Sequence, residues 1–333
     1  RLADIMSQAN LNGTVGLNIS IAGNNTLQTG FSTLPYNTTP DGAILLNQYD
    51  GYNGNALLRD SINSILQNTY PNMFSHTYAT KQKIAIETAE IFGAAVSAQQ
   101  LSGGILENGV TWNTSSPPNT TTSDNNLLAD QLSGVIKIIK ARTTLGMNRQ
   151  MFFVEEGGWD HHNELLDSQG GIAYPNSSIN DGANGKFYEV NEALEFFWKE
   201  LTAAGLENDV VLFTVSDFGR TLTSNGKGTD HAWSGNAFVM ANNAANGGPL
   251  NGGEIYGQYP ILDPGSNVLD LDIHKTNDTR GRMLPTTSAD EYLAEMVSWF
   301  GVDPTQLVNI FPNCTNFFNP ITTPNPLGML NIS

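Results

Sequence analysis

Residues 150–162 read QMFFVEEGGWDHH and residues 209–220 read DVVLFTVSDFGR, and the expected architecture follows from these two stretches. Each contains a short apolar run, 151–154 or 210–215, with the length and composition of a buried strand. Between them, residues 187–204 carry an apolar stripe at helical spacing. This order of strand, helix and strand predicts a βαβ unit with two parallel strands.

Further helices are predicted at three places where apolar residues recur every three or four positions. They comprise residues 78–99, a helix capped by Ser123 or Asp124 and stopped by Gly146, and a helix that begins at the capping box of Ser288 and Glu291. Additional short strands are expected at 15–21 and 237–240. The whole pattern predicts an α/β fold with a mostly parallel central sheet flanked by helices.

We expect one α/β domain over residues 1–333. Residues 102–126 are rich in glycine, proline, serine, threonine and asparagine, which predicts a loop insertion in this domain. The Pro- and Asn-rich residues 312–333 predict an irregular tail. The single cysteine, Cys314, allows no disulfide within the chain, so the fold must depend on its core.

The chain is strongly acidic, with 15 basic and 32 acidic residues and a formal net charge of −17. Such a charge repels nucleic acid, which we therefore exclude as a partner. No apolar run reaches the roughly 18 residues that a membrane-spanning helix needs. An acidic, lysine-poor composition is typical of proteins that work outside the cell, and a secreted, periplasmic or cell-surface location is expected.

Two acidic residues follow the predicted strands of the βαβ unit. Asp160 comes after the first strand and Asp217 directly after the second. The carboxyl ends of parallel strands meet at one edge of a sheet, where ligands of α/β proteins bind. These two carboxylates are therefore expected to lie on one rim.

Histidines gather in the same motifs. His161 and His162 follow Asp160, while His231 follows Asp230 in the sequence GTDHAW of residues 228–233. Side chains two positions apart point the same way in an extended chain, so His162 is the expected partner of Asp160. The candidate metal ligands are Asp160, His162, Asp217, Asp230 and His231. This mixed set of nitrogen and oxygen atoms suits a divalent ion, zinc or manganese better than calcium.

Arg220 and His231 are the candidate catalytic residues. Arg220 could neutralise Asp217 in a salt bridge, or it could bind a phosphate or sulfate through its planar guanidinium group. His231 could serve as a general acid or base instead of a metal ligand. The sequence contains no recognisable activated nucleophile and no glycine-rich nucleotide-binding fingerprint.

Several motifs resemble a family of uncharacterised exported bacterial proteins, a domain of unknown function that often uses the twin-arginine route. The matching segments are residues 158–162, 216–226, 228–233, 257–260, 281–288 and 299–301. The resemblance implies the fold of the alkaline phosphatase and sulfatase-like superfamily. Members of the family open with a strand and a glycine-rich acidic segment, which we expect to precede Arg1 or to come from a second chain.

The leading hypothesis is therefore an exported, metal-dependent hydrolase of phosphate or sulfate esters, with a small anionic ester as its substrate. The second is a non-catalytic surface or assembly protein that retains the fold. A third is a carbohydrate-binding module that uses Trp112, Trp159 and Trp233 as stacking surfaces.

Overall fold

A computed structural model of the chain describes residues 1–10, 15–26, 28–44, 49, 56–118, 126–163, 165–166, 186–263, 268–272 and 279–332. The chain forms two compact units. The first contains Arg1 and residues 3–155, and the second contains Leu2 and residues 156–333.

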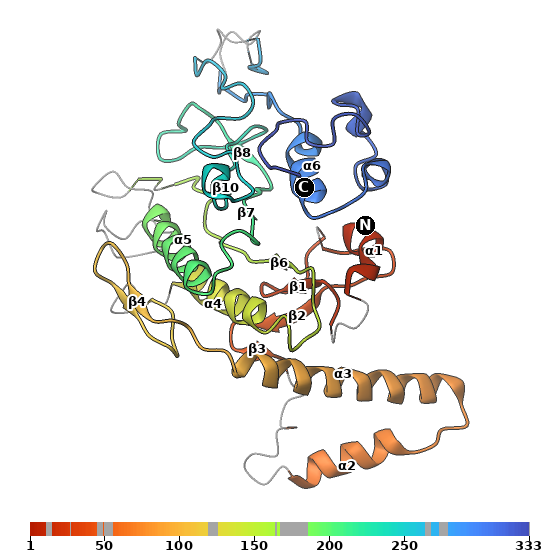
Figure 1. Cartoon of the computed structure of the whole chain (residues 1–333). Helices are drawn as coiled ribbons and strands as arrows, with labels where there is room; N and C mark the ends of the chain where they lie inside the picture. The colour runs from red at the N-terminus through yellow and green to blue at the C-terminus, as the bar shows by residue number, and fades with distance from the viewer. Residues whose placement is uncertain are drawn as a thin grey trace. The chain divides into compact units, whose positions relative to one another are not determined.

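The first unit is built around a four-stranded sheet with the order β3-β2-β1-β6 (Figure 1). The central strand β1 (Asn18–Ser20) pairs in parallel with β2 (Tyr36–Thr39) and with β6 (Met151–Phe153). Strand β3 (Gly42–Ala43) pairs antiparallel with β2 at the edge. The protein is therefore a mixed α/β protein with a small mixed sheet.

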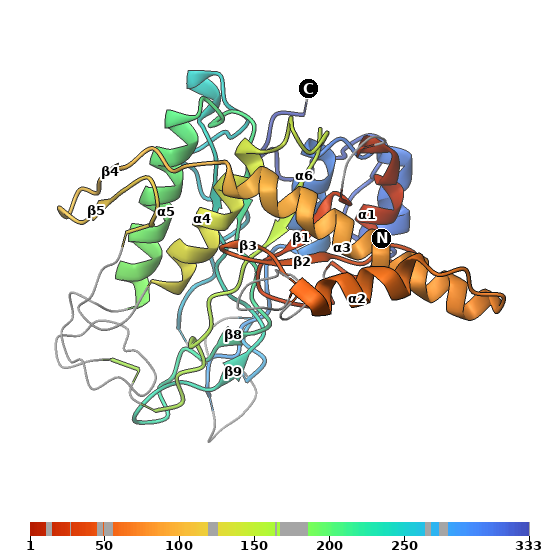
Figure 2. The same cartoon turned by 90° about the horizontal axis from the view of Figure 1, so that it is seen from below.

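The first unit also contains helices. Their bounds are α1 (Leu2–Ile5), η1 (Ser7–Asn10), α2 (Ala56–Gln67), α3 (Met73–Ser97) and α4 (Leu127–Lys140). Helix α3 contacts β3 and α4, and α2 packs against α3 as a helical hairpin (Figure 2). Phe92 and Ile136 are fully buried, and the Phe92 ring lies 4.8 Å from the ring of Tyr36.

The helix starts differ in part from those predicted. Helix α3 begins earlier than expected, because the side chain of Asn72 accepts the backbone N–H groups of Phe74 and Ser75. The cap of α4 is Asn126, whose side chain accepts the N–H of Ala129 at 3.0 Å. The predicted caps Ser123 and Asp124 lie outside the described residues.

The predicted loop insertion contains regular structure. Strands β4 (Gly104–Ile105) and β5 (Thr111–Trp112) form an antiparallel hairpin within residues 102–126. Trp112 is buried against Gly104, where a Cβ atom would lie 2.6 Å from the indole ring. The close approach of the indole ring therefore requires a glycine at position 104.

The second unit contains helices and short strand pairs. Its elements are α5 (Lys186–Ala203), β7 (Leu212–Phe213), β8 (Gly219–Arg220), β9 (His231–Ala232), β10 (Val239–Met240), η4 (Ala244–Asn246), α6 (Ala289–Trp299), η5 (Pro304–Gln306), α7 (Leu307–Ile310) and η6 (Cys314–Asn316). The capping box of Ser288 and Glu291 is present at the start of α6, as predicted. Gly205 follows α5 with a φ of +65°, the conformation expected of a glycine helix stop.

The pairing predicted for the βαβ unit is corrected by the structure. Among the described strands, β6 pairs with β1, whereas β7 pairs antiparallel with β10 in a separate sheet. A large parallel central sheet is thus not found in the described part of the chain. Apolar patterns identify strands, but the pairing partner depends on contacts between distant segments.

The tail of the chain is firmly attached within the second unit. The carboxylate of Glu295 on α6 accepts four consecutive backbone N–H groups, those of residues 327–330, at 2.6–3.1 Å. Glu295 itself is fully buried. Met329 and Leu330 pack with Met296 of α6 in a buried cluster.

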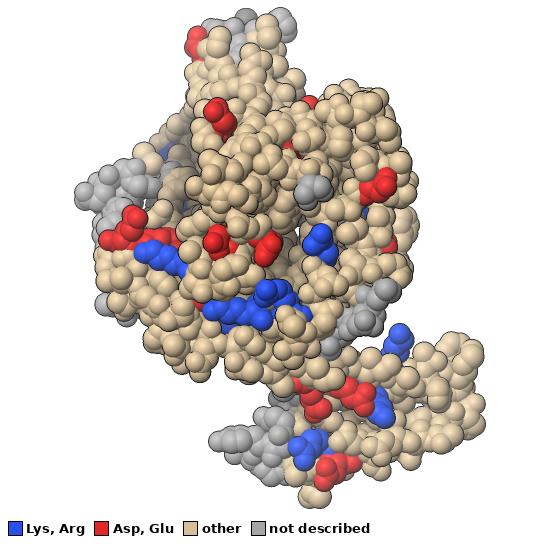
Figure 3. Space-filling model, in the orientation of Figure 1, with Lys and Arg blue, Asp and Glu red and all other residues tan. Residues whose placement is uncertain are grey.

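Charged side chains are sparse among the described residues on the face shown in Figure 3, in agreement with a charged fraction of 14%. No helix in the described part of the chain is both long enough and apolar enough to cross a membrane.

Candidate metal centre

Strands β8 and β9 form an antiparallel ribbon in which Arg220 pairs with His231 and Gly219 with Ala232. Paired residues of an antiparallel ribbon place their side chains on the same face. Gly219 permits this ribbon, because a Cβ atom at that position would lie 1.7 Å from the carbonyl oxygen of Ser234. The sequence thus brings a guanidinium group and an imidazole together through one short hairpin.

The segment that carries Asp160 and His162 runs beside the loop that leads into β9. The N–H of Thr229 donates to the carbonyl oxygen of His161 at 3.0 Å. The side chain of Asn225 donates to the carbonyl oxygen of His162 at 3.0 Å. Gly228 lies so close to the backbone of His161 that an added Cβ atom would be 2.3 Å from the His161 carbonyl oxygen. These backbone contacts bring the two segments into register.

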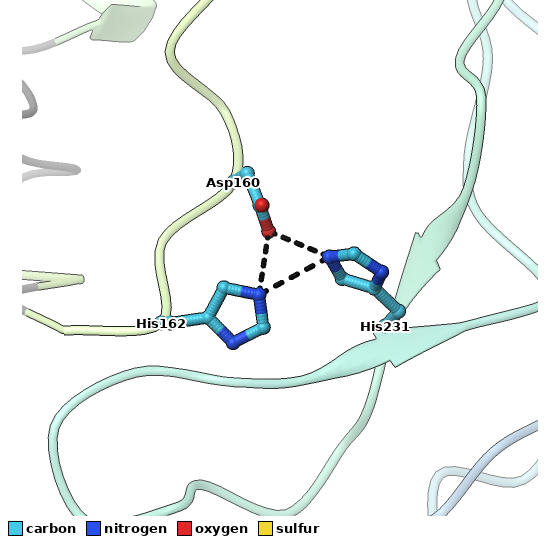
Figure 4. A group of neighbouring side chains, drawn as sticks. All are labelled: Asp160, His162 and His231. Carbon is cyan, nitrogen blue, oxygen red and sulfur yellow. Dashed lines mark hydrogen bonds and ion pairs between the residues drawn. The ribbon is translucent and has the colours of Figure 1, made fainter.

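Three ligand atoms converge where the two segments meet (Figure 4). The Oδ1 atom of Asp160 lies 3.0 Å from Nε2 of His162 and 2.9 Å from Nε2 of His231. The two Nε2 atoms are 3.1 Å apart. All three side chains are about half exposed, at 50%, 43% and 53% in that order. The group is therefore open to solvent and to a ligand.

Neighbouring groups hold the rings in place. Nδ1 of His162 lies 3.3 Å from Oδ1 of Asp230, whose other carboxylate oxygen pairs with Arg280. The ring of Phe218 stacks on His231, with centroids 4.0 Å apart and an angle of 21° between the planes. The Asp230 carboxylate and the Phe218 ring thus help to orient the two imidazoles.

Arg220 spans the site. Its Nε donates to Oγ1 of Thr229 at 2.8 Å, its Nη2 donates to the carbonyl oxygen of His161 at 2.8 Å, and its Nη1 pairs with Asp160. Two of these contacts do not involve Asp160 and fix the plane of the guanidinium group by themselves.

The ionisation of Asp160 reflects these neighbours. Its limited burial raises the pKa, but the hydrogen bonds from Arg220 and His231 and the proximity of His162 outweigh this effect. The pKa of Asp160 is therefore held below its ordinary value. A carboxylate that stays ionised in mild acid is available to a cation.

The structure gathers most, but not all, of the predicted site residues. Asp160, His162 and His231 form the group, and Asp230 lies behind His162 instead of among the three ligand atoms. Asp217 is exposed and lies outside the group. The salt-bridge partner proposed for Asp217 was Arg220, which pairs with Asp160 instead. Asp217 lies in a bend before β8, outside the ribbon that pairs Arg220 with His231.

Three residues of the site had no assigned role in the sequence. Phe218 and Asn225 lie inside the quoted motifs, and Arg280 directly precedes the motif of residues 281–288. Arg280 reaches the site because its carbonyl oxygen accepts the N–H of Thr223 at 3.0 Å. Membership of a motif was the available signal for Phe218 and Asn225, but their partners depend on the fold.

Comparison with known proteins gives a family but no characterised relative. No curated protein and no solved structure matches the chain. A family model described as "Protein of unknown function (DUF1501)" matches residues 115–305, more than half of the chain and the whole of the Asp160, His162 and His231 group. The chain therefore belongs to the DUF1501 family of proteins of unknown function.

Proposed function

We propose that Asp160, His162 and His231 bind a divalent metal ion and that the protein hydrolyses phosphate or sulfate esters. The observation that carries this proposal is the convergence of one carboxylate oxygen and two imidazole nitrogens within 3.1 Å, in a solvent-open group. Hydrogen bonds alone do not link all three atoms of this group well, because each neutral imidazole carries only one proton. A cation would satisfy all three atoms at once.

The spacing of the three atoms can be compared with that of ligand atoms around one metal ion. Two atoms about 2.1 Å from one ion lie ~3.0 Å apart at a right angle and ~3.4 Å apart at the tetrahedral angle. The observed separations of 2.9, 3.0 and 3.1 Å are also ordinary hydrogen-bond distances, and a small shift of the side chains would suit either zinc or manganese.

The surrounding residues suit an anionic ester. A bound divalent ion supplies Lewis acidity and an acidified water molecule. Arg220 keeps its contacts with Thr229 and His161 when Asp160 binds a metal, which leaves Nη1 free to bind an ester oxygen. His231 acts as a ligand in this arrangement, and the general-acid role remains the alternative for this residue.

We infer the wider context from the motif resemblance given above. It supports membership of the alkaline phosphatase and sulfatase-like superfamily and export from the cytoplasm. The −17 formal charge accords with an exported protein that does not bind nucleic acid.

The test is a comparison of purified wild-type protein with Asp160→Asn and His231→Ala. The metal content is measured after dialysis against Mn²⁺ or Zn²⁺, and aryl phosphate and aryl sulfate are offered as substrates. We expect wild type to retain about one ion and turn over one ester class, and both variants to lose the ion. Asp209→Asn, an exposed aspartate in the same unit, is the matched control. A wild type that retains no ion and turns over neither ester would refute the proposal.

The second candidate function is assembly. The α2 and α3 hairpin exposes large apolar side chains, including Leu57 at 80%, Phe74 at 79% and Met73 at 73%. Helix α2 has no buried residue, and exposed apolar surface of this kind is typical of protein contacts. Analytical ultracentrifugation of wild type and Leu57→Glu tests it. Assembly would be favoured if wild type forms a polymer and Leu57→Glu does not. Wild type that is a monomer at all concentrations would refute it.

A further inference from the structure

We propose that Asp230 is a positioning residue that keeps the single proton of neutral His162 on Nδ1, with Arg280 holding Asp230 in place. His162 then presents the lone pair of Nε2 to Asp160 and His231. This inference rests on the proposed metal site, because only an unprotonated Nε2 can bind an ion. It assigns functions to two side chains outside the group of ligand atoms.

Both ring nitrogens of His162 face a carboxylate, so two acids compete for one proton. Nδ1 lies 3.3 Å from Oδ1 of Asp230, and Nε2 lies 3.0 Å from Oδ1 of Asp160. A proton on Nε2 would point into the triangle and block the ion. A proton on Nδ1 would leave the triangle ready for an ion.

The contacts of the two carboxylates favour Nδ1. Oδ1 of Asp160 already faces Nη1 of Arg220 and Nε2 of His231, so a third proton there meets a crowded oxygen. Oδ1 of Asp230 has one other neighbouring donor among the described contacts, the side chain of Asn225 at 3.2 Å. A second carboxylate behind a metal-binding histidine is also the usual way in which proteins fix its tautomer.

Asp230 is held rigidly enough to have this effect. Its N–H donates to Oγ1 of Thr221 at 3.1 Å, and its carbonyl oxygen accepts the N–H of Thr221 at 2.9 Å. Arg280 pairs with Oδ2 and leaves Oδ1 directed at His162. The carboxylate therefore has little freedom to rotate away from the imidazole.

The tautomer can be read directly by nitrogen-15 NMR on metal-free protein at pH 8.5, with the His162 signals assigned from a His162→Gln variant. We expect Nδ1–H in wild type and in the control Asp209→Ala. In Asp230→Ala we expect Nε2–H, donated to Asp160. Nε2–H in wild type, or an unchanged tautomer in Asp230→Ala, would overturn the inference. This measurement needs neither metal nor substrate, so it stands apart from the test of hydrolysis.

A titration with Mn²⁺ alone gives the consequence for binding. Asp230→Ala should weaken the affinity by about 10- to 100-fold, the usual effect of losing such a partner. Arg280→Gln should weaken it less, because Asp230 remains. If Asp230→Ala does not fold, Asp230→Leu, which keeps the bulk and removes the acceptor, serves for both measurements. Equal Mn²⁺ affinity in wild type and the Asp230 variant would overturn the positioning role while leaving the metal site intact.

Discussion

The Oδ1 atom of Asp160 and the Nε2 atom of His231 lie 2.9 Å apart, although 71 positions separate the two residues in the sequence. The contact depends on the β8 and β9 ribbon, on Arg220 across that ribbon, and on the backbone hydrogen bond between Thr229 and His161. Each of these supports can be removed separately by substitution.

Arg220→Gln is expected to raise the pKa of Asp160 toward its ordinary value, because the ion pair that favours the carboxylate is lost. A carboxyl whose folded pKa is lowered stabilises the fold above its ordinary pKa and loses this effect as the pH falls through the folded value. The free energy of unfolding of the variant should therefore depend less on pH in acid than that of wild type. Carbon-13 NMR titration of the metal-free protein measures the pKa, with Arg59→Gln as control. An unchanged Asp160 pKa contradicts the prediction.

Gly219→Ala should destabilise the β8 and β9 ribbon by about 1 to 3 kcal/mol, because the new Cβ atom would meet the Ser234 carbonyl oxygen at 1.7 Å. Metal binding should be lost along with the placement of His231. Thermal unfolding and Mn²⁺ titration check both effects. Gly157→Ala, where no atom lies within 4 Å of the new Cβ, is the matched control and should behave as wild type.

Glu295→Ala should cost about 3 kcal/mol or more, because four backbone N–H groups lose a buried acceptor. Glu295→Gln should cost less, since its one carbonyl oxygen can still accept. Hydrogen exchange at residues 327–330 should accelerate in both variants, and more in the alanine variant. Glu87→Ala, at an exposed position of α3, serves as the control. Equal protection of these amides in all variants would disprove the anchoring role.

Asp4 stabilises the first unit by accepting the backbone N–H groups of Phe31, Ser32 and Thr33. Burial raises its pKa, but these bonds and the two hydroxyl groups of Ser32 and Thr33 lower the pKa well below its ordinary value. Asp4→Ala should therefore cost about 1 to 2 kcal/mol at neutral pH. The difference in unfolding free energy between wild type and the variant should shrink as the pH falls below about 4, because the Asp4 carboxyl of the unfolded chain then takes up a proton. Urea unfolding at pH 7 and pH 3 measures both values.

Tyr292 gives the opposite pH dependence. Burial raises the pKa of its hydroxyl group to about 12, and this group donates to the carbonyl oxygen of Thr214 at 3.0 Å. The unfolded chain ionises near pH 10, so stability should fall as the pH rises from about 10 to 12. Tyr292→Phe should cost about 1 kcal/mol at pH 7 and should remove this part of the alkaline loss. Melting temperatures at pH 7, 9 and 11 test the prediction, and identical slopes for both proteins would contradict it.

Local features were predictable where the cause is local. The capping box of Ser288 and Glu291 and the glycine after α5 depend on contacts within a few residues, and both are present. The pairing of Asp160 with His162 is also local, because the residues are two positions apart. The expected position of Asp217 at the site did not depend on local contacts, because it required β6 and β7 to share one sheet edge.

The sequence alone determined which chemical groups the site offers and where many of the local elements form. Its motifs supply the carboxylates, the imidazoles and Arg220 of the site, and its apolar spacing predicts the helices α3 to α6 and the strands β6 and β7, since both depend on residue type and short-range geometry. Only the tertiary structure decided that Arg220 pairs with Asp160, that Asp230 lies behind His162, and that Glu295 holds the tail. These contacts join segments tens of residues apart, and no local preference encodes which distant partner a side chain will meet.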